Sequence, residues 1–144
     1  IEWRTDYLAQ KINPIILPAA RALITKHTAQ NDTLLIITAT NSFITTPIAE
    51  KLVIPNLIAT EPEIINGHFT GKVAGTPSYQ QGKVTRLKTW LSQTGHTLDD
   101  SYFYSDSHND LPLLELVTHP VAVDPDSTLR ATAQQRHWPI ISLR

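Results

Sequence analysis

The chain has 144 residues, of which 41% are hydrophobic, and a formal net charge of −1. This length and composition fit one folded domain rather than a disordered segment. Its twelve Lys and Arg residues are scattered and no apolar run approaches the roughly 20 residues of a membrane span, so neither a nucleic-acid partner nor a membrane is expected. The absence of cysteine excludes disulfides and thiolate sites and fits a cytoplasmic location.

The first half of the chain alternates between helical and extended patterns. Apolar residues at helical spacing follow Pro18, and the continuous apolar run 34–37 is typical of a strand buried on both faces. Asn66-Gly67, between two extended segments, is a strong hairpin signal. In chain order, we expect a helix from Pro18, a strand over 34–37, a helix with Pro47 in its first turn, a strand over 57–60 and a hairpin over 63–70.

The second half continues the alternation. An apolar stripe predicts a helix over 83–94 that Gly95 ends, and the aromatic run from Tyr102 predicts a buried strand that ends at Ser105. Strands that alternate with helices imply an α/β fold, Rossmann-like, with a mostly parallel sheet and helices on both faces. The remaining predicted elements are a helix over 111–117, a strand over 121–123, a helix over 127–136 and a strand over 139–143.

The loop from Ser105 to Asp110 carries the strongest functional signal. Asp106 and Asp110 follow the end of a predicted buried strand, and open α/β sheets bind ligands at that edge. Mg²⁺ prefers oxygen ligands and usually takes one or two carboxylates together with phosphate oxygens. The pair therefore predicts a metal-assisted phosphate site. The structural alternative is that Asp110 caps the following helix and Asp106 forms an Asx turn.

Two further loops carry polar groups that suit phosphate. Thr38 follows the first predicted strand, and a hydroxyl beside the N–H groups of a strand-to-helix turn suits a phosphate oxygen. Its ordinary alternative is a helix cap or a Ser/Thr turn. Lys83 lies at a helix start, where a cation opposes the helix dipole, although a solvated Lys is the ordinary alternative. Each signal is weak alone, and their order along the chain is more specific.

This ordered set resembles the haloacid dehalogenase (HAD) superfamily, and most closely its phosphoserine-phosphatase-like subfamily IB. The likeness runs from about Pro14 to Arg144. It implies a Mg²⁺-dependent phosphomonoester hydrolase that acts on a small phosphorylated metabolite through an aspartyl-phosphate intermediate. The segments that carry it are Leu34–Asn41, Ala59–Glu61, Asn66–Gly71, Gly75–Pro77, Gly82–Val84 and Ser105–Asp110.

The resemblance also implies a role for each matched residue. Thr38 would bind a phosphoryl oxygen, and Lys83 would neutralise charge on the nucleophile and on the transferring phosphoryl group. Asp106 would ligate Mg²⁺, and Asp110 would support the metal directly or through water. The other candidates for phosphate or substrate binding are Ala39, Asn41 and Asn109.

One motif of the family has no counterpart here. The nucleophile of HAD enzymes lies in an Asp-x-Asp motif after the first strand, and no such motif precedes Thr38. Asp124-Pro125-Asp126 has the spacing, but it follows a late strand and is expected to be a loop before a helix. The family places its first strand at the centre of the sheet, between the strands that end at Thr38 and Ser105.

These departures predict a partial enzyme. The chain starts at Ile1 and contains no methionine, so we expect it to be the C-terminal part of a longer phosphatase that is inactive without its N-terminal segment. Residues 1–16 would be the end of the cap or its return linker, and residues 17–144 a partial HAD-like core.

Two alternative interpretations of the chain stay open at this point. The chain could be a non-catalytic fragment or regulatory domain that binds phosphate and metal, or a Rossmann-like domain whose acids are only caps. Phosphoserine is in doubt as the substrate, because Thr38-Ala39-Thr40 stands where phosphoserine phosphatases commonly carry Ser-Gly-Gly. His108, inside the acidic loop, could contact substrate but is expected to be solvated.

Overall fold

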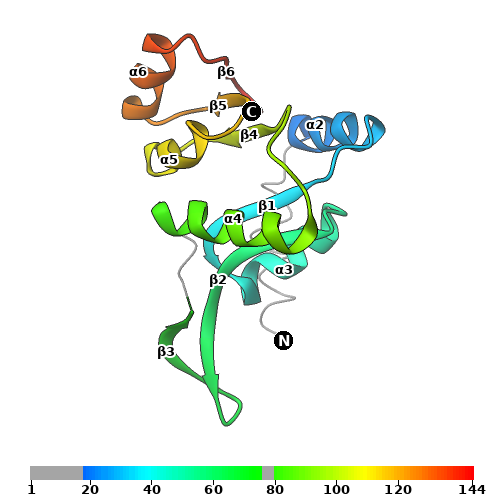
Figure 1. Ribbon diagram of the computed structural model, residues 1–144, viewed down its shortest axis with the longest axis vertical. Helices are drawn as coiled ribbons and strands as arrows, with labels where there is room; N and C mark the ends of the chain where they lie inside the picture. Colours follow the sequence, from blue (N-terminus) through cyan, green and yellow to red (C-terminus); the bar gives the residue numbers. More distant parts are fainter. Residues whose placement is uncertain (1–17, 76–79) are drawn as a thin grey trace. The chain divides into compact units, whose positions relative to one another are not determined.

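The computed structural model describes residues 18–75 and 80–144 (Figure 1). It divides into two compact units. Unit one comprises residues 1–78 and unit two residues 79–144. Residues 1–16, predicted to be the end of a cap or a linker, lie outside the described residues. None of the described helices is long and apolar enough to cross a membrane. The cytoplasmic location stays a prediction.

Unit one contains a three-stranded mixed sheet in the order β1-β2-β3. β1 (Leu35–Asn41) pairs in parallel with β2 (Asn56–Ile65), which pairs antiparallel with β3 (His68–Ala74) (Figure 1). Asn66 and Gly67 join β2 to β3 with positive φ values of 54° and 79°, as a tight hairpin turn requires. The predicted hairpin is therefore confirmed, and its strands are longer than predicted.

Two helices of unit one are described, α2 (Pro18–Ala29) and α3 (Ser42–Lys51). α3 packs on both strands of the parallel pair, β1 and β2. It begins directly after β1 because the Asn41 side chain caps it, accepting a hydrogen bond from the Ile44 N–H at 3.1 Å. Pro47 consequently lies inside the helix. The prediction that Pro47 occupies the first turn is wrong, because the cap decides where the helix starts.

Unit two contains a second sheet, in the order β4-β5-β6, and all its described pairs are parallel. α5 packs on β4, and α6 packs on β5 and β6. A fully buried cluster of Leu114, Ala122, Leu129 and Ala133 lies between these helices and strands. The elements are α4 (Gln81–Thr94), β4 (Tyr102–Ser105), the 3₁₀ turn η3 (His108–Asp110), α5 (Leu111–Leu114), β5 (His119–Val123), α6 (Ser127–Gln135) and β6 (Ile140–Ile141).

The element types of unit two follow the predictions, and some boundaries differ. α4 ends where predicted, at Gly95, which has a left-handed φ of 78° and donates its N–H to Leu91 O at 2.9 Å. α5 is shorter than the predicted helix over 111–117, since its last residue is Leu114. The parallel strands and their covering helices confirm the α/β fold class.

Candidate active site

The acidic loop, Ser105 to Asp110, begins at the last residue of β4 and is stabilised by serine hydroxyls. Ser105 Oγ accepts from the Ser107 N–H at 3.2 Å, and Ser107 Oγ accepts from the Asn109 N–H at 3.1 Å. The Asp110 N–H donates to Ser107 O at 3.1 Å, which closes the η3 turn. Short polar side chains therefore bring both ends of the loop together within six residues.

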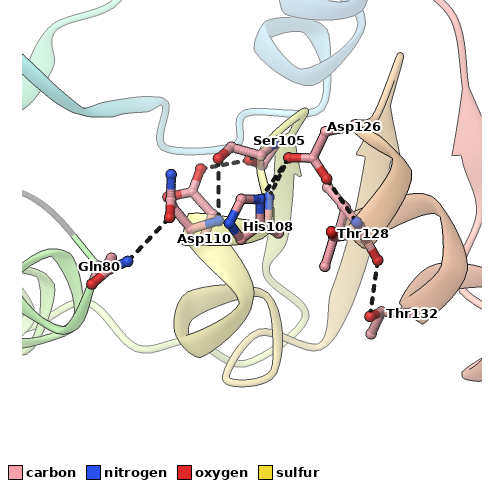
Figure 2. Close-up of polar contacts among 10 residues, drawn as sticks. Gln80, Ser105, His108, Asp110, Asp126, Thr128 and Thr132 are labelled. Carbon is pink, nitrogen blue, oxygen red and sulfur yellow. Dashed lines mark hydrogen bonds and ion pairs between the residues drawn. The ribbon is translucent and has the colours of Figure 1, made fainter.

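Asp110 is buried, and two side chains bind its carboxylate. Lys83 Nζ donates to Oδ1 at 2.6 Å and Ser105 Oγ donates to Oδ2 at 2.5 Å (Figure 2 shows Ser105 and Asp110). The carboxylate makes no capping hydrogen bond to α5, so the alternative interpretation of Asp110 as a helix cap is wrong. A buried charge is stable only when it is paired, and here Lys83 supplies the pair.

Lys83 itself is not an ordinary solvated lysine. Its exposure is 8%, equal to that of Asp110, although it lies in the first turn of α4, where the helix dipole disfavours a cation. The structure therefore rules out the solvated alternative for Lys83. An ammonium group has three donors, and the described contacts of Nζ use one of them, on Asp110. Donors remain for an anionic ligand.

Asp106 contrasts with Asp110, because its side chain is exposed. Within the described part of unit two, its carboxylate has no hydrogen-bond or ion-pair partner, so the Asx-turn alternative gains no support. Only its backbone is held, through a hydrogen bond of 2.9 Å from the Asp126 N–H to Asp106 O. An exposed, unpaired carboxylate is a suitable ligand for a hard cation.

Asn109 is linked to the start of α4 by a residue that the sequence did not single out. Gln80 Nε2 donates to Asn109 Oδ1 at 3.0 Å (Figure 2). The Oδ1 acceptor of the Asn109 amide is therefore engaged. Its Nδ2 group can only donate hydrogen bonds, which suits binding to a phosphate oxygen. Gln80 has a φ of 47°, uncommon for a residue with a side chain, and no local pattern signals this contact.

The other candidate residues belong to unit one. Thr38 lies in β1, where its Oγ1 accepts from the Thr40 N–H at 3.1 Å. Asn41 caps α3, as described above, and Ala39 is exposed. Both hydrogen bonds are ordinary turn and cap contacts. That these residues share a site with Lys83 and the acidic loop stays a prediction.

The donor set of the acidic loop fits part of a magnesium site. No group of three or more His, Asp or Glu residues is placed to hold a metal in the part of the chain that the structure describes. Mg²⁺ keeps several waters and is usually bound by one or two carboxylates plus substrate phosphate. Asp106 supplies a free carboxylate and Asp110 a second one nearby in the same loop, so the two fit the ion's preference for few protein ligands.

His108 and Asp126 form a further contact at the loop. His108 is exposed, as expected, but its Nδ1 lies 2.9 Å from Asp126 Oδ2. The segment Asp124-Pro125-Asp126 is the expected loop before a helix, and Asp126 caps α6 by accepting from the Leu129 N–H at 2.7 Å. The backbone N–H groups of Leu129 and His108 hold the pKa of Asp126 down at about 2. Its carboxylate is therefore ionised at neutral pH.

A model of the haloacid dehalogenase-like hydrolase family matches residues 1–115. The chain belongs to this family. The predicted resemblance is thereby confirmed. Histidinol-phosphatase of Neisseria meningitidis is 44% identical over 147 residues, a match that covers 99% of the chain and 66% of the relative. Phosphoserine phosphatase SerB1 of Mycobacterium tuberculosis is 33% identical over 129 residues, covering 90% of the chain and 42% of the relative.

Solved structures of other proteins share the fold. A protein of unknown function from Bordetella pertussis has 44% identity and a TM-score of 0.95, and the match covers 99% of this chain and 66% of that one. A probable phosphoserine phosphatase from Vibrio cholerae has 21% identity and a TM-score of 0.72, covering 89% of this chain and 38% of that one. The chain thus spans two thirds or less of the length of these proteins.

Proposed function

We propose that the protein containing this chain is a Mg²⁺-dependent phosphomonoester hydrolase that forms an aspartyl-phosphate intermediate. The observation that carries the proposal is the buried Lys83–Asp110 ion pair, whose Asp110 lies in the same loop as the exposed Asp106. Burying an ion pair usually contributes little stability compared with apolar residues of the same volume. Relatives of this chain are named phosphatases. A buried ion pair at the end of a parallel strand in such a family is better explained by a role in catalysis than by a contribution to stability.

Each residue of unit two has a distinct role in this proposal. Lys83 directs its remaining N–H donors at the transferring phosphoryl group, and Asp110 fixes the position of its Nζ. Asp106 would ligate Mg²⁺, with Asp110 supporting the ion directly or through water, and the bound ion would supply Lewis-acid polarisation of a phosphoryl oxygen. Asn109 donates its Nδ2 to the substrate phosphate. Thr38, from unit one, would add its hydroxyl.

We also propose that the nucleophile belongs to a segment of the same protein outside this chain. Two observations support this proposal. No Asp-x-Asp motif precedes Thr38. Among the described strands, β1 pairs only with β2 and β4 pairs only with β5, so each has an edge open to another strand. The 144-residue chain alone would then be inactive, and a non-catalytic phosphate- or metal-binding role is what would remain for it.

The relatives support a substrate class. One is named a histidinol-phosphatase and another a phosphoserine phosphatase, and both names denote phosphate esters of small amino-bearing metabolites. We propose a substrate of this class. Histidinol phosphate is the first to test, because the histidinol-phosphatase has the higher identity and Thr38-Ala39-Thr40 departs from the phosphoserine phosphatase pattern.

Phosphate release by the full-length protein tests the proposed function. Histidinol phosphate, phosphoserine and para-nitrophenyl phosphate are each supplied with Mg²⁺ and, separately, with EDTA. We expect turnover of at least one ester with Mg²⁺ and none with EDTA, and no turnover by the 144-residue chain alone. A full-length protein that hydrolyses none of them would favour the non-catalytic role, and an active 144-residue chain would overturn the external nucleophile.

The Gln80–Asn109 contact leads to a separate prediction. Replacing Gln80 with Ala frees the acceptor end of the Asn109 amide, so the side chain can rotate away from the phosphate. One hydrogen bond of ordinary strength corresponds to a rise in KM of about 2- to 10-fold. Steady-state kinetics of the full-length protein measure it, with Gln81→Ala, an exposed neighbour of the same type, as the control. Equal KM values for the two variants would remove Gln80 from the site.

A further inference from the structure

Asp126, in the connection between β5 and α6, holds the acidic loop. Its Oδ2 accepts from both the His108 N–H and His108 Nδ1, each at 2.9 Å (Figure 2). Its own N–H donates to Asp106 O at 2.9 Å. One residue that follows β5 therefore binds the loop after β4 at two points, through its side chain and through its backbone.

The same residue is fixed to the core of unit two. Asp126 Oδ1 accepts from the N–H of Leu129, whose side chain is completely buried between α6 and the sheet. The two oxygens of one carboxylate thus have different tasks, since Oδ1 caps α6 and Oδ2 binds the acidic loop. Because the carboxylate is ionised at neutral pH, these are charge-assisted hydrogen bonds, which are stronger than neutral ones.

We propose that Asp126 is a positioning residue that fixes the acidic loop and, through it, the carboxylate of Asp106. Lys83 and Ser105 hold the other end of the loop at Asp110. The side chain of Asp106 has no partner among the described residues, so its position depends on the backbone that Asp126 holds. The part of this inference that concerns Mg²⁺ rests on the proposed function, and the part that concerns the order of the loop does not.

An Asp126→Asn variant separates the two tasks of the carboxylate. Asparagine is a good helix cap, so its single side-chain oxygen can still accept from the Leu129 N–H. Its NH₂ group then faces the His108 N–H, donor against donor, so the side-chain contact with the loop is lost, while the backbone hydrogen bond to Asp106 O can remain. Asp126→Ser has the same purpose, because serine also caps helices well and its shorter side chain cannot reach both partners.

The control is Asp124→Asn, in the same connection. Asp124 Oδ2 accepts from the Leu143 N–H at 3.1 Å and lies 3.9 Å from Arg144 Nε. None of its described contacts involves the acidic loop. A loss of stability alone would thus affect the Asp124 and Asp126 variants alike, and a change confined to the loop would single out Asp126.

The test measures amide hydrogen exchange over residues 106–109 and Mg²⁺ affinity by calorimetry, in the full-length protein. We expect Asp126→Asn and Asp126→Ser to exchange the His108 amide about 10-fold faster and to bind Mg²⁺ about 10-fold more weakly, the ratio expected for hydrogen bonds of ordinary strength. Asp124→Asn should change neither. Wild-type exchange in both Asp126 variants would overturn the inference. If the wild type binds no Mg²⁺, the proposed function fails, and the exchange rates still decide whether Asp126 orders the loop.

Discussion

A Lys83→Met variant of the full-length protein is expected to lose at least about 100-fold in kcat, because removing one preorganised donor to a developing charge typically costs 10²–10³ in rate. It should also be less stable by about 3–5 kcal/mol, since the buried carboxylate of Asp110 is left without its counter-charge. Phosphate-release kinetics and urea unfolding measure the two effects. The exposed Lys88 of the same helix provides the control, and Lys88→Met should change stability by no more than about 0.5 kcal/mol.

The double variant Lys83→Met/Asp110→Asn separates stability from catalysis. Removing both charges leaves no unpaired ion, and Ser105 Oγ can still donate to the amide oxygen of the new Asn side chain. We expect most of the stability to return while kcat stays low. Recovery of activity in the double variant would show that Lys83 acts only as a counter-charge for Asp110. Equal instability of the single and double variants would contradict the structural role of the pair.

The parts of the fold that depend on local chemistry could be predicted from the sequence. Asn66-Gly67 fixes a hairpin because its two residues adopt the positive φ values that the turn needs, and Gly95 ends α4 for the same reason. Pro47 shows where local rules compete. Proline favours the first turn of a helix, but the Asn41 side-chain cap sets an earlier start for α3. The helix therefore extends on both sides of the proline.

The site could be predicted only in part, because its decisive contacts are distant in the chain. From the sequence alone, the acids at 106 and 110 are candidates for either caps or metal ligands. The side chain that excludes the cap for Asp110 is Lys83, 27 positions away. The Gln80–Asn109 and His108–Asp126 contacts join residues 29 and 18 positions apart. Nothing in the sequence around Gln80 indicates its contact, whereas Asp126 could be recognised as a cap but not as an anchor of the acidic loop.

The second large effect is expected for Asp106→Asn. Under the proposed function, this change removes a charged ligand of Mg²⁺, and the loss of metal-derived charge stabilisation should lower kcat by about 100-fold or more. Stability should hardly change, because the Asp106 side chain is exposed and makes no described contact. The midpoint of the Mg²⁺ activation curve should also move to a higher concentration.

Loss of activity with unchanged stability is the opposite of what the loss of a structural cap would cause. It also distinguishes Asp106 from Asp110, whose replacement should lower both activity and stability. Asp99→Asn is a suitable control, since Asp99 is also exposed and its described contact is made through its backbone N–H. Kinetics at several Mg²⁺ concentrations and thermal unfolding of both variants provide the comparison. An Asp106→Asn protein with wild-type kcat and an unchanged Mg²⁺ midpoint would show that the metal is bound elsewhere, and the acidic loop would then have to be understood through the Lys83–Asp110 pair alone.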